Sequence, residues 1–137
     1  MTSYVADTSV LLAWYLPESC SESARVWRKK LLSDSVRLIV PSLHYWEFGN
    51  VLRTYILRKE LTADLAKEIF GLHLEAPLEI HDPEKAAVFD AALAYGATMY
   101  DAVFIALSLS VDVRLLTAEK STTPWVVKLG DRVVPVK

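Results

Sequence analysis

The chain has 137 residues, of which 53% are hydrophobic, and its formal net charge at neutral pH is -2. The length predicts one domain over residues 1–137, and the charge excludes a wholly basic nucleic-acid-binding protein, so any nucleic-acid site has to be a local patch. The hydrophobic share is high enough to predict an apolar surface that a partner covers.

Several features predict a cytoplasmic protein without a membrane segment. Cys20 is the only cysteine, so no internal disulfide can form, which fits a reducing compartment. The N-terminus lacks the basic region of a signal peptide, and Asp7 interrupts its first apolar stretch. The longest apolar runs, Val10–Leu16 and Ala102–Leu107, are too short to span a bilayer.

Short apolar runs alternate with helical patterns in the first half of the chain. Ser3–Ala6 is expected to form a buried strand, and Thr8 and Ser9 are N-cap residue types for an apolar helix at Val10–Leu16. The elements expected next are a helix at Glu18–Ser33, a strand at Val36–Val40, a helix from its N-cap Ser42 to about Lys59, and a helix at Ala63–Leu74 capped by Thr62.

The second half continues the alternation. Its expected elements are a strand at Leu78–His81, a helix at Glu84–Tyr95 that ends at Gly96, an apolar helix from about Tyr100, a strand at Val113–Leu116, and two short strands, Trp125–Leu129 and Arg132–Pro135. Strands that alternate with helices predict an α/β fold, a three-layer α/β/α sandwich around a central, mostly parallel sheet.

Four acidic residues fall where such a sheet binds ligands, at the carboxyl ends of its strands. Asp7 follows the first strand, and Glu119 follows the fourth. Glu47 lies in the second turn of the helix after the second strand, and Asp101 begins the apolar helix that leads into the fourth. We therefore expect these four carboxylates at one edge of the sheet.

Four carboxylates that lie close together repel one another, so some stay protonated unless a cation compensates their charge. Mg²⁺ or Mn²⁺ fits best, because both prefer oxygen ligands and are held by a few carboxylates together with substrate phosphates. Zn²⁺ is not expected, since no Cys or His is predicted near these positions. A metal held there would activate a water molecule and stabilise the charge on a phosphodiester.

Short motifs surround these acids: Asp7-Thr8-Ser9 after a strand, Glu47-x-x-Asn50 on a helix, Tyr100-Asp101-Ala102 at a helix start, and Thr117-Ala118-Glu119 after a strand. In this order and spacing they resemble the motifs of the PIN-domain family, and in particular the VapC toxins of prokaryotic toxin–antitoxin pairs. The resemblance covers essentially the whole chain.

The resemblance implies an Mg²⁺- or Mn²⁺-dependent endoribonuclease that acts as a homodimer on RNA and is covered by a VapB-like protein antitoxin. It also implies site roles: catalytic carboxylates at Asp7, Glu47, Asp101 and Glu119, metal ligands at Asp7, Asp101 and Glu119, and supporting polar groups at Thr8, Ser9, Asn50 and Thr117. Glu119 departs from the aspartate that the family most often has there, which affects binding of a second metal and turnover.

Each acid by itself also has an ordinary structural explanation as a cap, a first-turn acid or an exposed residue. The basic run with Arg25, Arg28 and Lys29 is either a solvated helix face or a surface that contacts RNA phosphates. The three histidines, His44, His73 and His81, are expected to be incidental surface or partly buried residues.

Two other functions are consistent with the sequence. The first is a receiver-like signalling domain phosphorylated on Asp82, with Thr117 and Lys120 nearby; a lone Asp7 at the first strand end argues against it. The second is a PIN relative that binds RNA but turns it over poorly because of Glu119.

Overall fold

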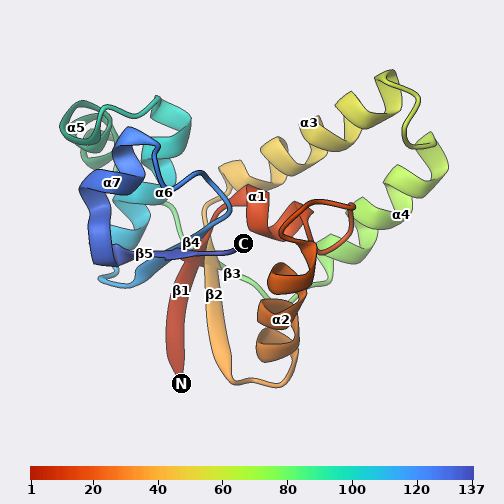
Figure 1. The fold of residues 1–137 in the computed structure, drawn as a ribbon, viewed down its shortest axis with the longest axis horizontal. Coiled ribbons are helices and arrows are strands. Elements are labelled where there is room, and N and C mark those ends of the chain that lie inside the picture. The colour runs from red at the N-terminus through yellow and green to blue at the C-terminus, as the bar shows by residue number, and fades with distance from the viewer.

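The computed structural model describes residues 1–137 and shows strands and helices in close alternation (Figure 1). The elements are β1 (Thr2–Ala6), α1 (Thr8–Leu12), α2 (Ser21–Leu32), β2 (Val36–Val40), α3 (Leu43–Leu57), α4 (Ala63–Leu74), β3 (Glu79–Ile80), α5 (Lys85–Tyr95), α6 (Met99–Ser110), β4 (Arg114–Thr117), α7 (Pro124–Leu129), the 3-10 turn η1 (Gly130–Arg132) and β5 (Val133–Pro135).

The five strands form one sheet in the order β3-β2-β1-β4-β5, and every neighbouring pair is parallel. The chain extends from the central β1 through β2 to β3 on one side, and β4 and β5 occupy the other side. The strand order therefore reverses between β1 and β4, which is where parallel sheets of this kind form ligand sites. The predicted sandwich around a parallel sheet is confirmed.

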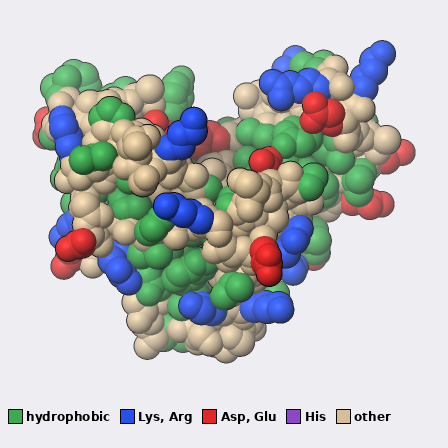
Figure 2. Space-filling model, viewed as in Figure 1, with side chains coloured by type: hydrophobic (Ala, Val, Ile, Leu, Met, Phe, Trp, Pro, Cys, Tyr) green, Lys and Arg blue, Asp and Glu red, His purple; other side chains and the backbone are tan.

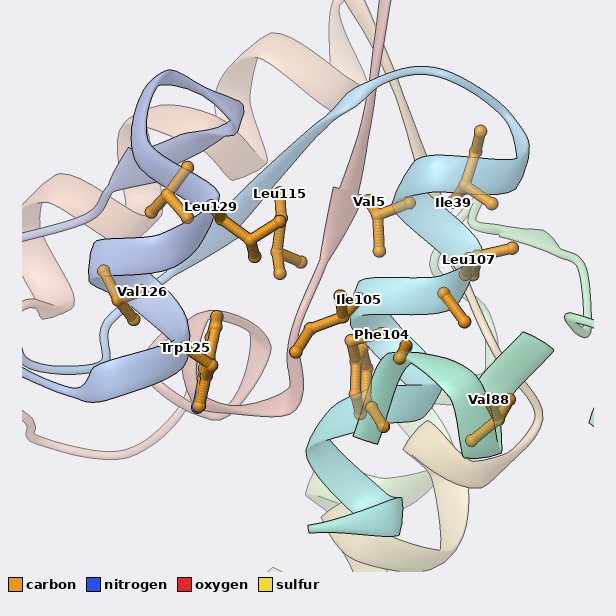
Figure 3. Packing of buried hydrophobic residues seen from close by; sticks show 14 residues of the cluster. Val5, Ile39, Val88, Phe104, Ile105, Leu107, Leu115, Trp125, Val126 and Leu129 are labelled. Atoms are coloured by element: carbon orange, nitrogen blue, oxygen red, sulfur yellow. The ribbon is translucent and has the colours of Figure 1, made fainter. Parts of the chain in front are cut away.

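Alternate residues of the strands supply two separate cores. Val5 and Leu115 lie on the face covered by α5, α6 and α7 (Figure 3), whereas Ala6 and Leu116 lie on the face covered by α1 and α2. Successive side chains of a strand point to opposite faces, and a sheet buried on both faces needs apolar residues at all of these positions. The apolar runs of the strands follow from this requirement.

Helices α3 and α4 form an antiparallel arm that projects from the sheet (Figure 1). A third apolar cluster joins the arm to the short helix α1, with Phe48 and Leu52 of α3 packed near Leu12 and Leu16. The arm therefore carries the Glu47 side of α3 next to the start of α1, at the carboxyl end of β1.

Several local expectations failed, among them the helix at Val10–Leu16, since α1 spans Thr8–Leu12. Trp125–Leu129 lies in helix α7, not in a strand: Pro124 starts the helix, and Trp125, Val126 and Leu129 share its buried face. Helix α1 is capped by Asp7, whose side chain accepts a hydrogen bond from the Ser9 N–H. Thr8 and Ser9, the expected N-cap types, do not occupy the cap position. Ser42 makes no side-chain cap, because its hydroxyl donates to Asp82 Oδ2 at 2.6 Å.

The expected cap at Thr62 and the left-handed helix end at Gly96 are both present. No single helix has the length and hydropathy needed to cross a bilayer, and only α5 and α6 together reach that threshold, as a pair bent by 107°.

Candidate functional site

An acidic pocket of about 240 Å³ opens where the strand order reverses, beyond the carboxyl ends of β1 and β4. Figure 2 shows acidic atoms in the hollow between the α3–α4 arm and the lobe formed by α5, α6 and α7. The pocket walls include the four carboxylates expected to lie together: Asp7, Glu47, Asp101 and Glu119. They come from four separate segments of the chain, and the fold brings them to one place.

Asp7 is held by a network of hydroxyl and amide donors. Its Oδ1 accepts hydrogen bonds from the Ser9 N–H, at 2.9 Å, and from the Ser9 hydroxyl, while its Oδ2 accepts one from the Thr117 hydroxyl. The Thr117 oxygen in turn accepts from the Glu119 N–H at 3.0 Å. One carboxylate thus links the start of α1 to the loop after β4.

Glu47 is fixed from the opposite side of the pocket. The Thr8 hydroxyl donates to Glu47 Oε1 at 2.8 Å, which connects the first residue of α1 to α3. Motif residues Thr8 and Ser9 therefore serve different carboxylates: Thr8 contacts Glu47, and Ser9 contacts Asp7.

Asp101 lies in the first turn of α6, and Glu119 lies in the loop after β4. The Asp101 N–H donates to the hydroxyl of the N-cap Thr98 at 3.2 Å, and Asp101 lines the pocket. Glu119 is exposed, and its Oε1 accepts a long hydrogen bond of 3.4 Å from the Thr123 hydroxyl.

The pocket concentrates negative charge without a basic partner. Burial raises the pKa of Asp7, against the hydrogen bonds from Ser9 and Thr117. Burial, followed by the charges of Asp7 and Asp101, raises the pKa of Glu47, and burial with the charge of Glu119 raises that of Asp101. None of the four carboxylates takes part in either of the chain's salt bridges. No three His, Cys, Asp or Glu side chains are grouped closely enough to hold a metal ion by themselves.

Some predicted site residues lie outside this pocket. Asn50 is exposed on α3 and does not line the pocket. Thr117 is buried and does not line the pocket, but its hydroxyl contacts two pocket residues, the carboxylate of Asp7 and the N–H of Glu119. Arg25, Arg28 and Lys29 lie on α2, away from the pocket walls, so their contact with RNA stays a prediction.

Two histidines occupy a place that the sequence did not predict. His44 and His73 are fully buried, and their Nε2 atoms lie 2.6 Å apart. His44 Nδ1 lies 3.4 Å from the Thr8 hydroxyl, so the expectation that no His would lie near the acids was wrong. In the sequence, only the position of His44, one helical turn before Glu47, could have indicated that a histidine lies near the acids. Nothing in the sequence indicated this for His73, which lies on α4.

Asp82, the phosphoacceptor of the receiver-like alternative, follows the edge strand β3. Its carboxylate accepts hydrogen bonds from the Ser42 N–H at 2.8 Å and from the Ser42 hydroxyl at 2.6 Å, which lower its pKa. Strands β2 and β1 separate β3 from β4, after which Thr117 and Lys120 follow. The three residues of that alternative are therefore not assembled into one site.

Comparison with known proteins adds independent evidence. The chain is 28% identical over 120 residues to Ribonuclease VapC3 of Pyrobaculum aerophilum, an alignment that covers 85% of this chain and 88% of that protein. Its fold is similar to that of PAE2754 from Pyrobaculum aerophilum (TM-score 0.74, 20% identity, 98% and 90% of the two chains covered). It is also similar to FitAcB from Neisseria gonorrhoeae (TM-score 0.61, 17% identity, 97% and 96% covered).

A family model described as PIN domain matches residues 4–121, a range that extends from within β1 to beyond β4 and includes all four acids of the pocket. Because this match spans most of the chain, the protein belongs to the PIN domain family.

Proposed function

We propose that this protein is a divalent-metal-dependent endoribonuclease, the toxin of a toxin–antitoxin pair, which hydrolyses RNA phosphodiester bonds in the acidic pocket. The observation that carries the proposal is the meeting of four carboxylates from four chain segments in one pocket without a salt bridge. Membership of the PIN family and the similarity to Ribonuclease VapC3 support the same activity.

The donor chemistry of the pocket fits Mg²⁺ or Mn²⁺, since carboxylate oxygens are the ligands that these ions prefer. Asp7, Asp101 and Glu119 are the proposed metal ligands, and Glu47 is the fourth catalytic carboxylate. A bound ion would activate water and offset the phosphodiester charge. Because the side chains alone do not form a complete site, water and RNA phosphate oxygens would supply the remaining ligands.

The chain's own residues prepare this pocket in two ways. Ser9 and Thr117 direct their hydroxyl groups at Asp7, and Thr8 directs its hydroxyl at Glu47, so both carboxylates keep one orientation. Each carboxylate oxygen can accept more than one hydrogen bond or metal contact. Asp7 can therefore remain fixed while it binds a cation, and Glu47 can remain fixed as the fourth catalytic carboxylate.

The test compares RNA cleavage in Mg²⁺, Mn²⁺ and EDTA, with a mixed set of structured and single-stranded RNAs. Asp101→Asn and Glu47→Gln are expected to abolish a metal-dependent cleavage that wild type shows. The matched controls are Asp90→Asn on α5 and Glu68→Gln on α4, because both residues are exposed and make no side-chain hydrogen bond. Equal cleavage by wild type and Asp101→Asn would reject the proposal.

A catalytically weak, RNA-binding PIN protein is the second candidate, and the exposed position of Glu119 favours it. RNA binding without cleavage in either metal is its expected signature. Glu119→Asp would then restore cleavage if the longer side chain is the cause. The receiver-like alternative has lost its support, because the chain belongs to the PIN family and Asp82 is bound to Ser42.

The proposed partners are a second copy of the chain and a VapB-like antitoxin. Large apolar side chains are exposed on α5 and α6, including Phe89 and Leu93, and on the α3–α4 arm, including Trp46 and Leu57. Such surfaces are typical of protein–protein contacts. A dimeric mass by light scattering at micromolar concentration is expected, and a monomeric mass would contradict the homodimer.

A cytoplasmic location completes the proposal. Its support is chemical: Cys20 is buried and unpaired, as expected for a protein of a reducing compartment.

A further inference from the structure

A continuous series of polar contacts runs through the otherwise apolar region between α1, α3 and α4. It begins at Tyr15, whose hydroxyl lies 3.0 Å from His73 Nδ1, and it continues from His73 Nε2 to His44 Nε2 over 2.6 Å. From His44 Nδ1 it passes to the Thr8 hydroxyl over 3.4 Å, and from that hydroxyl to Glu47 Oε1 over 2.8 Å. Five side chains thus connect the region between α1, α3 and α4 to the acidic pocket.

Both histidines in this series are neutral at pH 7. Burial lowers the pKa of His44 to about 3, with a further contribution from His73, and burial lowers the pKa of His73 to about 4. A neutral imidazole has one N–H donor and one acceptor nitrogen. Each ring can therefore donate on only one of its two sides.

An ionised Glu47 allows one arrangement of the protons. Because the carboxylate only accepts, the Thr8 hydroxyl donates to it, and the Thr8 oxygen must accept from His44 Nδ1–H. His44 Nε2 is then the acceptor for His73 Nε2–H, and His73 Nδ1 accepts from the Tyr15 hydroxyl. The opposite direction would need a proton on Glu47, so the carboxylate sets the direction of every bond.

The surrounding aromatic rings keep the two imidazoles in place. Phe48 stacks on His73 with ring centroids 4.1 Å apart and an interplanar angle of 6°. His44 packs edge-to-face on Phe48 and on Tyr45. Ring rotation would therefore break packing as well as hydrogen bonds.

We propose that Tyr15, His73, His44 and Thr8 form a one-directional hydrogen-bond chain that ends on Glu47. In this chain His44 and His73 are positioning residues: they hold the Thr8 hydroxyl as a donor to the Glu47 carboxylate. The catalytic consequence rests on the proposed nuclease function, whereas the direction of the chain does not.

The direction can be measured without any activity, from histidine ring tautomers in long-range ¹H–¹⁵N NMR spectra at pH 7. The expected result is the Nδ1–H tautomer for His44 and the Nε2–H tautomer for His73, with signals assigned from His44→Gln and His73→Phe. The opposite tautomers, an average of both, or a charged ring would overturn the chain. Because the NMR measurement needs no activity, it tests the hydrogen-bond chain separately from the nuclease proposal.

A matched pair of substitutions tests the role of His44 in cleavage. The amide nitrogen of Asn takes the place of Nδ1 and that of Gln the place of Nε2, so only His44→Asn keeps a donor toward Thr8. Loss of one positioning hydrogen bond is expected to lower kcat of His44→Gln about tenfold with KM unchanged. His44→Asn is expected to keep wild-type kcat, as is the control His81→Gln at an exposed histidine.

The background Thr8→Val distinguishes positioning from general packing. If His44 acts through the Thr8 hydroxyl, adding His44→Gln to Thr8→Val lowers kcat no further, because contacting residues of one network are not additive. Equal losses in His44→Asn and His44→Gln, or additive losses in the double variant, would assign His44 a structural role only. Melting temperatures of all variants identify any that fail to fold, and for those the tautomer measurement decides.

Discussion

The Thr117 hydroxyl donates a hydrogen bond to Asp7 Oδ2 although the two residues are 110 positions apart in the sequence. Both residues are located at the carboxyl ends of neighbouring strands, β1 and β4, whose registers pair Ala6 with Leu116. The bond therefore depends on the central strand pairing, and it connects the stability of the sheet to the orientation of a proposed metal ligand.

Replacing Thr117 with Val should destabilise the protein. Thr117 is fully buried, and the change keeps its shape but leaves Asp7 Oδ2 and the Glu119 N–H without this partner. Loss of partners for buried polar groups costs about 1–3 kcal/mol, which urea denaturation can measure. Thr122→Val, at an exposed position, is the control. Equal unfolding free energies for Thr117→Val and wild type would show that the bond contributes nothing.

Mg²⁺ or Mn²⁺ should raise the melting temperature of the wild-type protein. An ion that binds the folded state and offsets the repulsion among the pocket carboxylates stabilises the fold, by about 2.7 kcal/mol at a hundredfold excess over Kd. The shift should be much smaller in Asp101→Asn and unchanged in Asp90→Asn. Identical shifts in the two variants would place metal binding outside the acidic pocket.

In EDTA, Asp101→Asn should be more stable than wild type at neutral pH. The pKa of Asp101 is raised from 3.8, so the folded state holds this proton more tightly than the unfolded chain does. The stability that this tighter proton binding gives to the folded state is present below pH 3.8 and is lost as the pH rises through the folded pKa. The advantage of Asp101→Asn should therefore disappear on acidification. Urea denaturation from pH 7 to pH 3 measures it, and a pH-independent difference would contradict this origin.

The histidine pair should have the opposite pH dependence. Because the pKa values of His44 and His73 fall from 6.5 to about 3 and about 4, the unfolded chain binds more protons below pH 6.5. Their stabilising contribution is complete above pH 6.5 and is lost as the pH falls toward the folded values.

Between pH 6 and pH 4, each histidine should therefore cost the folded state up to about 1.4 kcal/mol per pH unit. His73→Phe should lose stability less steeply than wild type over this range. Parallel curves for His73→Phe and wild type would mean that His73 is not kept neutral by the fold.

Local pattern determined most of the fold. The alternation of apolar runs and helical periods predicted the parallel sheet and both helix layers, because a βαβ unit buries each strand on two faces. The positions of Asp7 and Glu119 after strands also predicted their meeting, since parallel strands end at one edge. Helix α7 was missed because six mostly apolar residues give too few turns to separate a helix from a strand.

Only the tertiary structure decided which side chains face one another. The sequence separates His44 from His73 by 29 positions, and their contact arises because the α3–α4 arm folds back on itself beside Tyr15. The hydrogen bonds from Thr8 to Glu47 and from Ser42 to Asp82 likewise join residues far apart in the sequence. Because the Ser42 hydroxyl donates to Asp82, it does not form the expected helix cap. Residue type and spacing fix which face of an element a side chain occupies, but the partner across an interface depends on how whole elements pack.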